Sequence, residues 1–204
     1  MTTMINGRDT HEEGGDARQR VLDAAEELFM RRGYNAIALR DIADALGIRQ
    51  ASLYYHFPEG KEQLYVAVTQ QVFERHRKGV TAALAAVQPE LRAQLGAVAE
   101  WFDTQPRMCL MGMIHADLPA LSPEHMGRVE EAAYTAIFSP LVAAFADAMR
   151  RGEIVAHNPY LLAGAFLALM DGLTIGETRA GSPSRAQNAG ELIAVLLDGL
   201  APRR

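Results

Sequence analysis

The sequence predicts an all-α fold, with an N-terminal three-helix part that contains a helix-turn-helix and a larger helical C-terminal part. Apolar residues recur at the three- and four-residue spacing of amphipathic helices, and no stretch of the 204-residue chain alternates as a half-buried strand does. Ser122 and Asn158 each precede a proline, an order typical of helix starts. The length allows one or two domains with a substantial core.

The first helix is expected to begin near Asp16 or Ala17 and to end at Gly33, after a basic pair. Residues 1–15 before it are polar and are expected to form a flexible tail, with no apolar segment of the kind found in signal peptides. Tyr34 is expected to pack in the core. The predicted apolar face of this helix comprises Val21, Leu22, Ala25, Leu28 and Phe29.

Two short helices joined by a glycine turn are predicted between Ala38 and Lys61. Gly47 ends the first helix because glycine readily adopts the left-handed backbone conformation needed there. Ile48 follows as an expected apolar plug under the turn, and the second helix begins near Gln50. The apolar positions expected on the inner faces of these helices are Ile42, Ala43, Leu46, Leu53 and Phe57.

The outward face of the second short helix has the polar mixture that a DNA-recognition helix needs. Gln50, Ser52, Tyr54, Tyr55 and His56 place amide, hydroxyl, phenol and imidazole groups close together. Such groups contact base edges and phosphates, and the helix N-terminus favours phosphate. The alternative interpretation is a solvent-exposed helical hairpin in an all-helical domain, with aromatic residues that belong partly to the core.

The segment ALRDIADALGIRQASLYYHFPEGKEQL, residues 38–64, resembles the N-terminal domain of TetR-family transcriptional regulators. It departs from the family pattern at Ala38, where threonine is usual, so a helix cap and a phosphate contact are expected to be missing. Leu46 replaces a common alanine, and residues 58–60 make the connection to the next helix slightly long. The matching positions are Arg40, Asp41, Ile42, Ala43, Gly47, Leu53, Tyr54, His56, Phe57, Lys61 and Leu64.

The resemblance implies a DNA-binding domain over residues 16–62 and a helical effector-binding and dimerisation domain over residues 63–204. A fourth helix from Lys61 is expected to transmit the ligand state to the DNA-binding heads, and its charged run, residues 75–78, is expected to face solvent. The residues expected to contact bases are Gln50, Ala51, Ser52 and Tyr55, and those expected to contact phosphates are Arg40, Tyr54, His56 and Lys61.

Composition is compatible with this interpretation. The formal net charge is −5, but phosphate affinity depends on the local charge at the contact surface, so only a modest basic patch is expected. The single cysteine, Cys109, excludes a disulfide within one chain and suits a reducing compartment. The longest apolar run, residues 161–170, is too short to span a bilayer, so a cytoplasmic protein without a membrane partner is expected.

The rest of the chain is predicted to be helical. Pro140 falls inside the longest helical pattern and is expected to kink or split it, with Ser139 capping the second piece. The predicted helices cover residues 89–104, 107–117, 123–151, 159–179 and 185–200.

Two helical segments, 123–151 and 159–179, occupy the positions at which the resembling family dimerises. A dimer would also place two recognition helices in successive major grooves, about 34–36 Å apart. The same apolar residues suit the core of one chain equally well. The candidates are Leu141, Phe145, Met149, Leu162, Phe166 and Leu169.

Aromatic and methionine side chains gather in the middle of the C-terminal part, which suits an adaptable apolar pocket. An ordinary helical core that uses methionine as filler is the alternative for each residue taken singly. His115, Asp117, Arg107, Glu100 and Asp103 are candidates for a polar contact that orients the ligand. The predicted ligand-binding residues are Trp101, Phe102, Met108, Met111, His115, Tyr134, Phe138 and Met170.

No enzyme or metal site is expected. His115, Asp117 and His125 do not follow a metal-binding spacing, and no phosphate loop, nucleophile elbow or paired-carboxylate motif is present. No cofactor is expected either. The predicted function is a homodimeric regulator, most simply a repressor, that binds a palindromic DNA operator and is released by a small apolar or amphipathic effector. The alternatives are an architectural DNA-binding dimer without a ligand and a protein-interaction module without DNA binding.

Overall fold

The computed structural model describes residues 9–106, 108–173 and 185–200 of the chain, and all regular elements in these ranges are helical. Contacts divide the chain into two compact units. The first contains the chain through Gln71 together with Gly112–Val129, and the second contains Val72–Met111 and the chain from Glu130 onward. These units differ from a division at residue 62, because a segment distant in sequence packs with the N-terminal helices.

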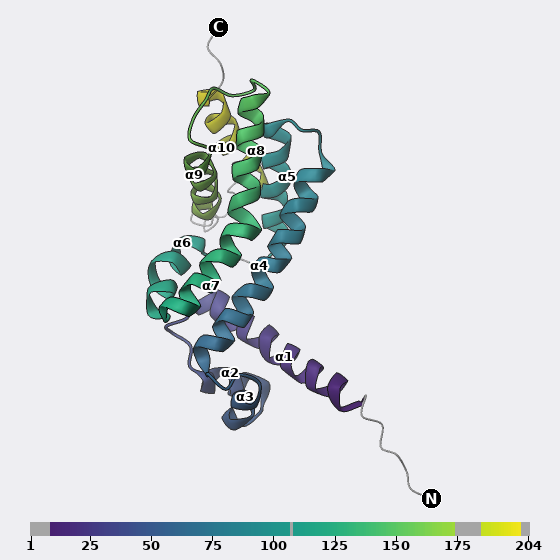
Figure 1. Cartoon of the computed structure of the whole chain (residues 1–204), viewed down its shortest axis with the longest axis vertical. Coiled ribbons are helices and arrows are strands. Elements are labelled where there is room, and N and C mark those ends of the chain that lie inside the picture. Colours follow the sequence, from purple (N-terminus) through teal and green to yellow (C-terminus); the bar gives the residue numbers. More distant parts are fainter. Residues whose placement is uncertain (1–8, 107, 174–184, 201–204) are drawn as a thin grey trace, which may run out of the picture. The chain divides into compact units, whose positions relative to one another are not determined.

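The first unit is built on α1 (Asp9–Arg32), α2 (Leu39–Leu46), α3 (Gln50–His56) and the start of α4 (Lys61–Ala86) (Figure 1). Helix α1 begins at Asp9, earlier than expected, because a helix extends through residues without apolar periodicity at little cost once it is nucleated. Its predicted apolar face is largely buried, with Leu28 half-buried. The fully buried side chains of the other helices in this unit include Ile42, Leu53, Phe57, Leu64 and Tyr65.

The turn between α2 and α3 forms as predicted, except at Ile48. Gly47 has φ +65° and ends α2, and the Ile48 N–H donates to the carbonyl of Ala43 at 3.0 Å. The Ile48 side chain is 36 % exposed, so it is not the buried plug that was expected. The Ala38 N–H donates to the Asp41 carboxylate at 2.7 Å, while Ala38 itself supplies no side-chain acceptor for the helix.

The other segment of the first unit contains irregular helical turns. A helix was predicted over residues 107–117, but α6 covers only Leu110–Gly112 and continues as the π-helical turn η1 (Met113–Asp117). A 3-10 turn, η2 (Leu118–Ala120), and the start of α7 (Pro123–Ala133) follow. The turn type changes here because η1 places Asp117 against the N-terminal helices, a tertiary contact that local sequence does not report.

The second unit is a helical bundle of α5 (Leu91–Thr104), α8 (Ser139–Arg150), α9 (Pro159–Gly172) and α10 (Arg185–Leu200), with the later part of α4 (Figure 1). Helix α5 packs against α8 and α10, and α9 packs against α8 and α10. The predicted cap at Asn158 is confirmed, because its side chain accepts a hydrogen bond from the Tyr160 N–H at 3.0 Å. Residues 174–179 of the helix predicted over 159–179 lie outside the described residues.

Pro140 does not split the chain into two capped helices, contrary to one of the two expectations. Helix α7, the π-helical turn η3 (Tyr134–Phe138) and α8 form one continuous helix, and Ser139 has helical φ and ψ of −58° and −45°. A proline cannot donate to the carbonyl four residues earlier and its ring collides with that carbonyl, so the wider π turn just before Pro140 accommodates it. Ser139 is therefore not a cap.

This continuous helix, Pro123–Arg150, is also the longest apolar helix among the described residues, longer than residues 161–170. Its length and hydropathy would allow it to cross a membrane, and helices in the cores of soluble proteins have the same properties. Leu141, Ala144, Phe145 and Ala148 of α8 are buried against the rest of the second unit. Packing within the bundle thus accounts for these four apolar residues of α8.

Candidate DNA interface and effector cavity

Helix α3 presents its polar side chains outward on two buried anchors. Leu53 and Phe57, four residues apart, are 0 % and 1 % exposed. Because they hold the inner face, the opposite face must be in solvent, and Tyr55 is 84 % exposed there. Gln50, Ala51, Ser52 and Tyr54 are exposed as well, and His56 is half-buried with its ring against Tyr55.

The basic residues next to α3 differ in the contacts that their side chains make. Arg40 is exposed and lies 3.6 Å from the Asp44 carboxylate, an ion pair that a phosphate can replace at little cost. The Lys61 ammonium lies 3.9 Å from the centre of the Tyr34 ring. Burial lowers the pKa of Lys61, and the nearby Asp117 and Asp41 carboxylates oppose this shift. The Tyr34 ring thus orients the lysine that was expected to bind phosphate.

Asp117 is buried in the first unit, and its carboxylate is hydrogen-bonded to two tyrosines there. One carboxylate oxygen accepts the Tyr34 N–H at 2.9 Å, and the other accepts the Tyr65 hydroxyl at 3.1 Å. Burial, together with the Asp117 charge, raises the pKa of Tyr65, so this phenol remains a donor. Tyr34 is half-buried with its ring centre 4.9 Å from that of Tyr65, which agrees with a core role. Asp117 therefore fastens η1 to the DNA-binding helices.

His125 makes a second attachment within the same unit. Its Nδ1 lies 3.1 Å from the Ser122 hydroxyl and 3.2 Å from a Glu62 carboxylate oxygen, while Nε2 lies 3.4 Å from Glu59. The Ser122 N–H also donates to Glu62. Burial would raise the pKa of Glu62, but the hydrogen bonds from Ser122 and His125 lower it. The start of α7 is thus held to the start of α4 by hydrogen bonds.

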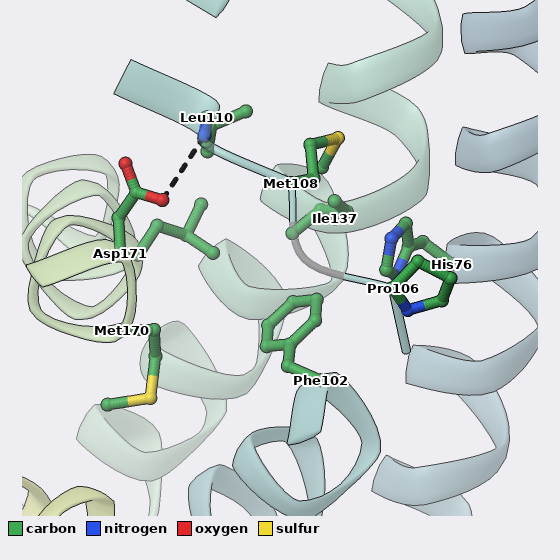
Figure 2. Close-up of a pocket in the computed structure, with 9 residues that line it drawn as sticks. His76, Phe102, Pro106, Met108, Leu110, Ile137, Met170 and Asp171 are labelled. Atoms are coloured by element: carbon green, nitrogen blue, oxygen red, sulfur yellow. Dashed lines mark hydrogen bonds between the residues drawn. The ribbon is translucent and has the colours of Figure 1, made fainter. Parts of the chain in front are cut away.

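The second unit contains a partly open cavity of about 50 Å³ (Figure 2). His76 lies on one side of it and Asp171 on the other, in α4 and α9. Of the predicted ligand residues, Phe102, Met108 and Met170 line the cavity. The remaining lining residues, which the sequence did not single out for this role, are Pro106, Leu110, Ile137 and Leu167.

His76 is buried, although residues 75–78 were expected to face solvent. It is 3 % exposed, while Arg77 and Lys78 beside it are exposed. Burial, with a smaller contribution from the charge of Arg75, lowers the pKa of His76 to about 4, so the ring is neutral near pH 7. The signal was present in the sequence, because His76 falls four residues after Val72 and three after Phe73 on the apolar face of α4.

Asp171 fixes the loop that enters the cavity wall. Its carboxylate accepts the backbone N–H of Leu110 at 3.2 Å (Figure 2). It also accepts the backbone N–H of Met111 at 2.9 Å. The Cys109 sulfur lies 3.9 Å from the same carboxylate. These contacts satisfy the first free N–H groups of α6 and place the preceding Met108 at the cavity.

The other predicted ligand residues lie elsewhere. Trp101 packs behind the cavity and donates to His76, and Met111 contributes a backbone N–H to Asp171. His115 is exposed in the first unit. Tyr134 is 43 % exposed and its ring lies against Phe138, which in turn contacts Tyr160. The other candidates for a polar contact are Glu100 and Asp103, which are exposed, and Arg107, which lies outside the described residues.

Comparison with known proteins assigns the N-terminal helices to a family. Residues 21–68 match the model of bacterial regulatory proteins of the tetR family. The chain is 39 % identical over 72 residues to the HTH-type transcriptional regulator LmrA of Bacillus subtilis, covering 35 % of this chain and 38 % of that protein. It is 33 % identical over 109 residues to the transcriptional repressor DhaR of a Mycobacterium species, covering 52 % and 54 %.

A third relative is the transcriptional activator FasR of Mycolicibacterium smegmatis, 36 % identical over 88 residues that cover 43 % of this chain and 40 % of FasR. The matches therefore span about two fifths to half of these relatives' length. Repressors and activators both occur among them.

Solved structures share the fold along nearly the whole chain. The structure of AibR with isovaleryl coenzyme A and operator DNA has a TM-score of 0.73 at 20 % identity, covering 88 % of this chain and 97 % of AibR. A regulator from Saccharomonospora viridis in complex with choline has a TM-score of 0.71 at 22 % identity, covering 93 % and 100 %.

The helix-turn-helix lies in the segment that matches bacterial regulatory proteins, and together with the helical bundle it makes up a fold that solved transcriptional regulators share. Residues 21–68 thus match the DNA-binding part of tetR-family regulators.

Proposed function

We propose that the protein is a homodimeric repressor that binds a palindromic operator and is released by a small effector. The observation that carries this proposal is the face of α3, where Leu53 and Phe57 are buried and the polar groups between them are exposed. Exposed amide and hydroxyl groups on a short helix with a rigid base can enter the major groove.

On this proposal Gln50, Ala51, Ser52 and Tyr55 contact bases, since their side chains share the exposed face. Arg40, Tyr54, His56 and Lys61 contact phosphates at its edges. The position of the Lys61 ammonium above the Tyr34 ring supports this assignment, because a cation held in place loses less conformational freedom when it binds phosphate.

The dimer interface that we propose lies on α9 and α10. Of the six apolar candidates, Leu141, Phe145, Leu162 and Phe166 are buried within the chain, and Met149 and Leu169 are half-buried. Leu161 of α9 is instead 66 % exposed, and Val195 of α10 is 72 % exposed. Large exposed apolar side chains on two packed helices suit a subunit interface.

The effector site that we propose is the cavity of the second unit. An effector that binds better to a conformation with low operator affinity must weaken DNA binding, since coupling between two sites is reciprocal. The wall of the cavity supports the proposal, because Met108 and Met170 can repack around a ligand. We further propose that the protein acts in the cytoplasm, where it meets its DNA.

Selection of bound sequences from a random DNA pool at two salt concentrations tests the proposal. A short inverted repeat that survives the higher salt is the expected result, because base contacts lose less affinity with salt than phosphate contacts do. Enrichment without a motif that disappears at higher salt would instead indicate an architectural DNA binder. Absence of any enrichment would contradict DNA recognition.

Substitutions then separate the two kinds of contact on the selected operator. Gln50→Ala is expected to relax the sequence preference at one base position. Lys61→Ala should instead weaken binding to all DNA sequences alike and reduce the dependence of affinity on salt concentration. Gln88→Ala, at an exposed position of the second unit, is the matched control and should change neither property. Equal operator binding by all three variants would contradict the assigned contacts.

A further inference from the structure

One nitrogen of His76 is buried at the cavity wall without a hydrogen-bond partner. The side chain is 3 % exposed, and Nε2 makes no hydrogen bond to the described residues. The other ring nitrogen, Nδ1, lies 3.3 Å from the indole Nε1 of Trp101. An indole N–H can only donate, so Nδ1 accepts and the single proton of the neutral ring is on Nε2. A residue that lines the cavity therefore carries an unsatisfied N–H donor.

Packing fixes the orientation of this donor. A Cβ atom at Gly79 would lie 2.0 Å from the indole ring of Trp101, so that ring occupies the space that a side chain would need on α4. With Trp101 held there, Nδ1 of His76 is directed to the indole, and Nε2 is the ring nitrogen that remains without a partner among the described residues. The Phe102 ring centre lies 5.5 Å from the imidazole, and Figure 2 shows both rings at the wall.

The rest of the lining determines which charge a ligand can carry. None of the described lining residues is Lys or Arg, and the Asp171 carboxylate lies across the cavity from His76. An anion would thus meet the negative charge of Asp171, and the described lining residues offer it no basic side chain. An ammonium ion has donors and no acceptor, so it cannot satisfy Nε2–H. An uncharged molecule with a hydrogen-bond acceptor meets both conditions.

The volume determines the size. A water molecule needs roughly 10–15 Å³ of such space, so about 50 Å³ holds only a few non-hydrogen atoms. Met108 and Met170 are unbranched and can move to enlarge the cavity somewhat.

We propose that the effector is a small uncharged molecule with an apolar body and a carbonyl or ether oxygen that accepts a hydrogen bond from His76 Nε2–H. His76 is then the residue that determines effector specificity. This inference rests on the proposed function, because it assigns the chemistry of the proposed effector site.

Two molecules of equal size and different hydrogen bonding test it. Cyclopentanone has the acceptor, and methylenecyclopentane replaces the oxygen by carbon. Both are titrated into the full-length, DNA-free protein labelled with 15N-histidine at pH 7, and the His76 resonances report binding. The expected spectrum shows the Nε2–H tautomer, with an Nε2 shift on adding the ketone.

Comparison with His76→Phe isolates the hydrogen bond from general hydrophobic affinity, with binding to that variant measured by thermal shift. The ratio of the alkene Kd to the ketone Kd is expected to be at least about tenfold larger in the wild type than in this variant. His76→Gln keeps a hydrogen-bond donor and should retain part of the preference for the ketone. This variant provides the test if His76→Phe does not fold. His157→Phe, at an exposed histidine, is the matched control and should keep the wild-type ratio.

An Nδ1–H tautomer, an unshifted Nε2 resonance at ketone saturation, no ketone binding, or the same ratio in wild type and His76→Phe would overturn the inference. A protein that selects an inverted repeat but shows none of the expected His76 behaviour would retain the proposed function and lose this inference. If no DNA sequence is selected but the ketone still shifts the His76 resonances, the inference about His76 is retained and the proposed function is lost.

Discussion

At the scale of single residues, the buried neutral imidazole of His76 makes folding stability depend on pH. Its pKa is about 4 in the folded protein, compared with about 6.5 in an unfolded chain. Below pH 6.5 the unfolded state binds a proton that the folded state does not, so this contribution to stability decreases as pH falls from 6.5 toward 4.

The expected size of this effect is a loss of about 2 kcal/mol between pH 7 and pH 5. Urea unfolding of the wild type and of His76→Phe at several pH values measures it, because the contribution disappears in the variant and those of the other histidines remain. His157→Phe should retain the wild-type dependence. Parallel pH profiles for wild type and His76→Phe would contradict a neutral buried His76.

Replacing Gly79 by alanine should destabilise the protein, whereas the same substitution usually stabilises a helix. In a helix interior, glycine to alanine normally stabilises by about 1 kcal/mol. At Gly79 the new Cβ would lie 2.0 Å from the Trp101 ring, so the ring must move and lose its hydrogen bond to His76. Gly79→Ala is expected to lower the free energy of unfolding by about 1–3 kcal/mol.

Gly96→Ala is the matched control for that substitution. Gly96 lies inside α5 and a Cβ there meets nothing within 4 Å, so this variant should be stabilised by about 0.5–1 kcal/mol. Thermal unfolding of both variants measures the difference. A stabilised Gly79→Ala protein would contradict the packing of Trp101 on α4.

At the scale of elements, α2 lacks one part of its N-terminal cap. Ala38 offers no side-chain acceptor, although Asp41 accepts the Ala38 N–H at 2.7 Å. Ala38→Thr should supply the missing acceptor and stabilise the protein by about 0.5–2 kcal/mol. It should also strengthen operator binding at low salt, since threonine adds a hydroxyl where the family places a phosphate contact.

The isosteric variant Ala38→Val separates the hydroxyl from the added bulk. Chemical denaturation and operator titration of both variants provide the comparison. If valine stabilises as much as threonine does, hydrogen bonding at the cap is not the cause.

At the scale of the whole molecule, the proposed dimer on α9 and α10 can be broken by one charge. In a two-fold interface each substitution occurs twice, so Leu161→Glu places two carboxylates in an apolar contact. The variant is expected to be monomeric by sedimentation equilibrium and to bind the operator at least tenfold more weakly.

Ile114→Glu is the control, because Ile114 is 42 % exposed in the first unit, whereas the proposed interface is formed by helices of the second unit. It should remain dimeric. A dimeric Leu161→Glu protein would place the subunit interface on another surface.

The sequence by itself determined the features that depend on neighbours along the chain. Helical spacing and Gly47 specified the helix-turn-helix. The four-residue spacing of Leu53 and Phe57, with polar residues between them, specified the outward face of α3. These predictions succeeded because helix faces and glycine turns are set within a few residues.

Tertiary structure alone decided which distant residues meet. Asp117 bonds to Tyr34 and Tyr65 in the first unit, and His76 is buried against Trp101 in the second. The sequence suggested a ligand contact for Asp117 and a solvent-exposed position for His76. Both assignments depended on contacts between segments tens of residues apart, and a buried polar group is stable only where such a partner satisfies it.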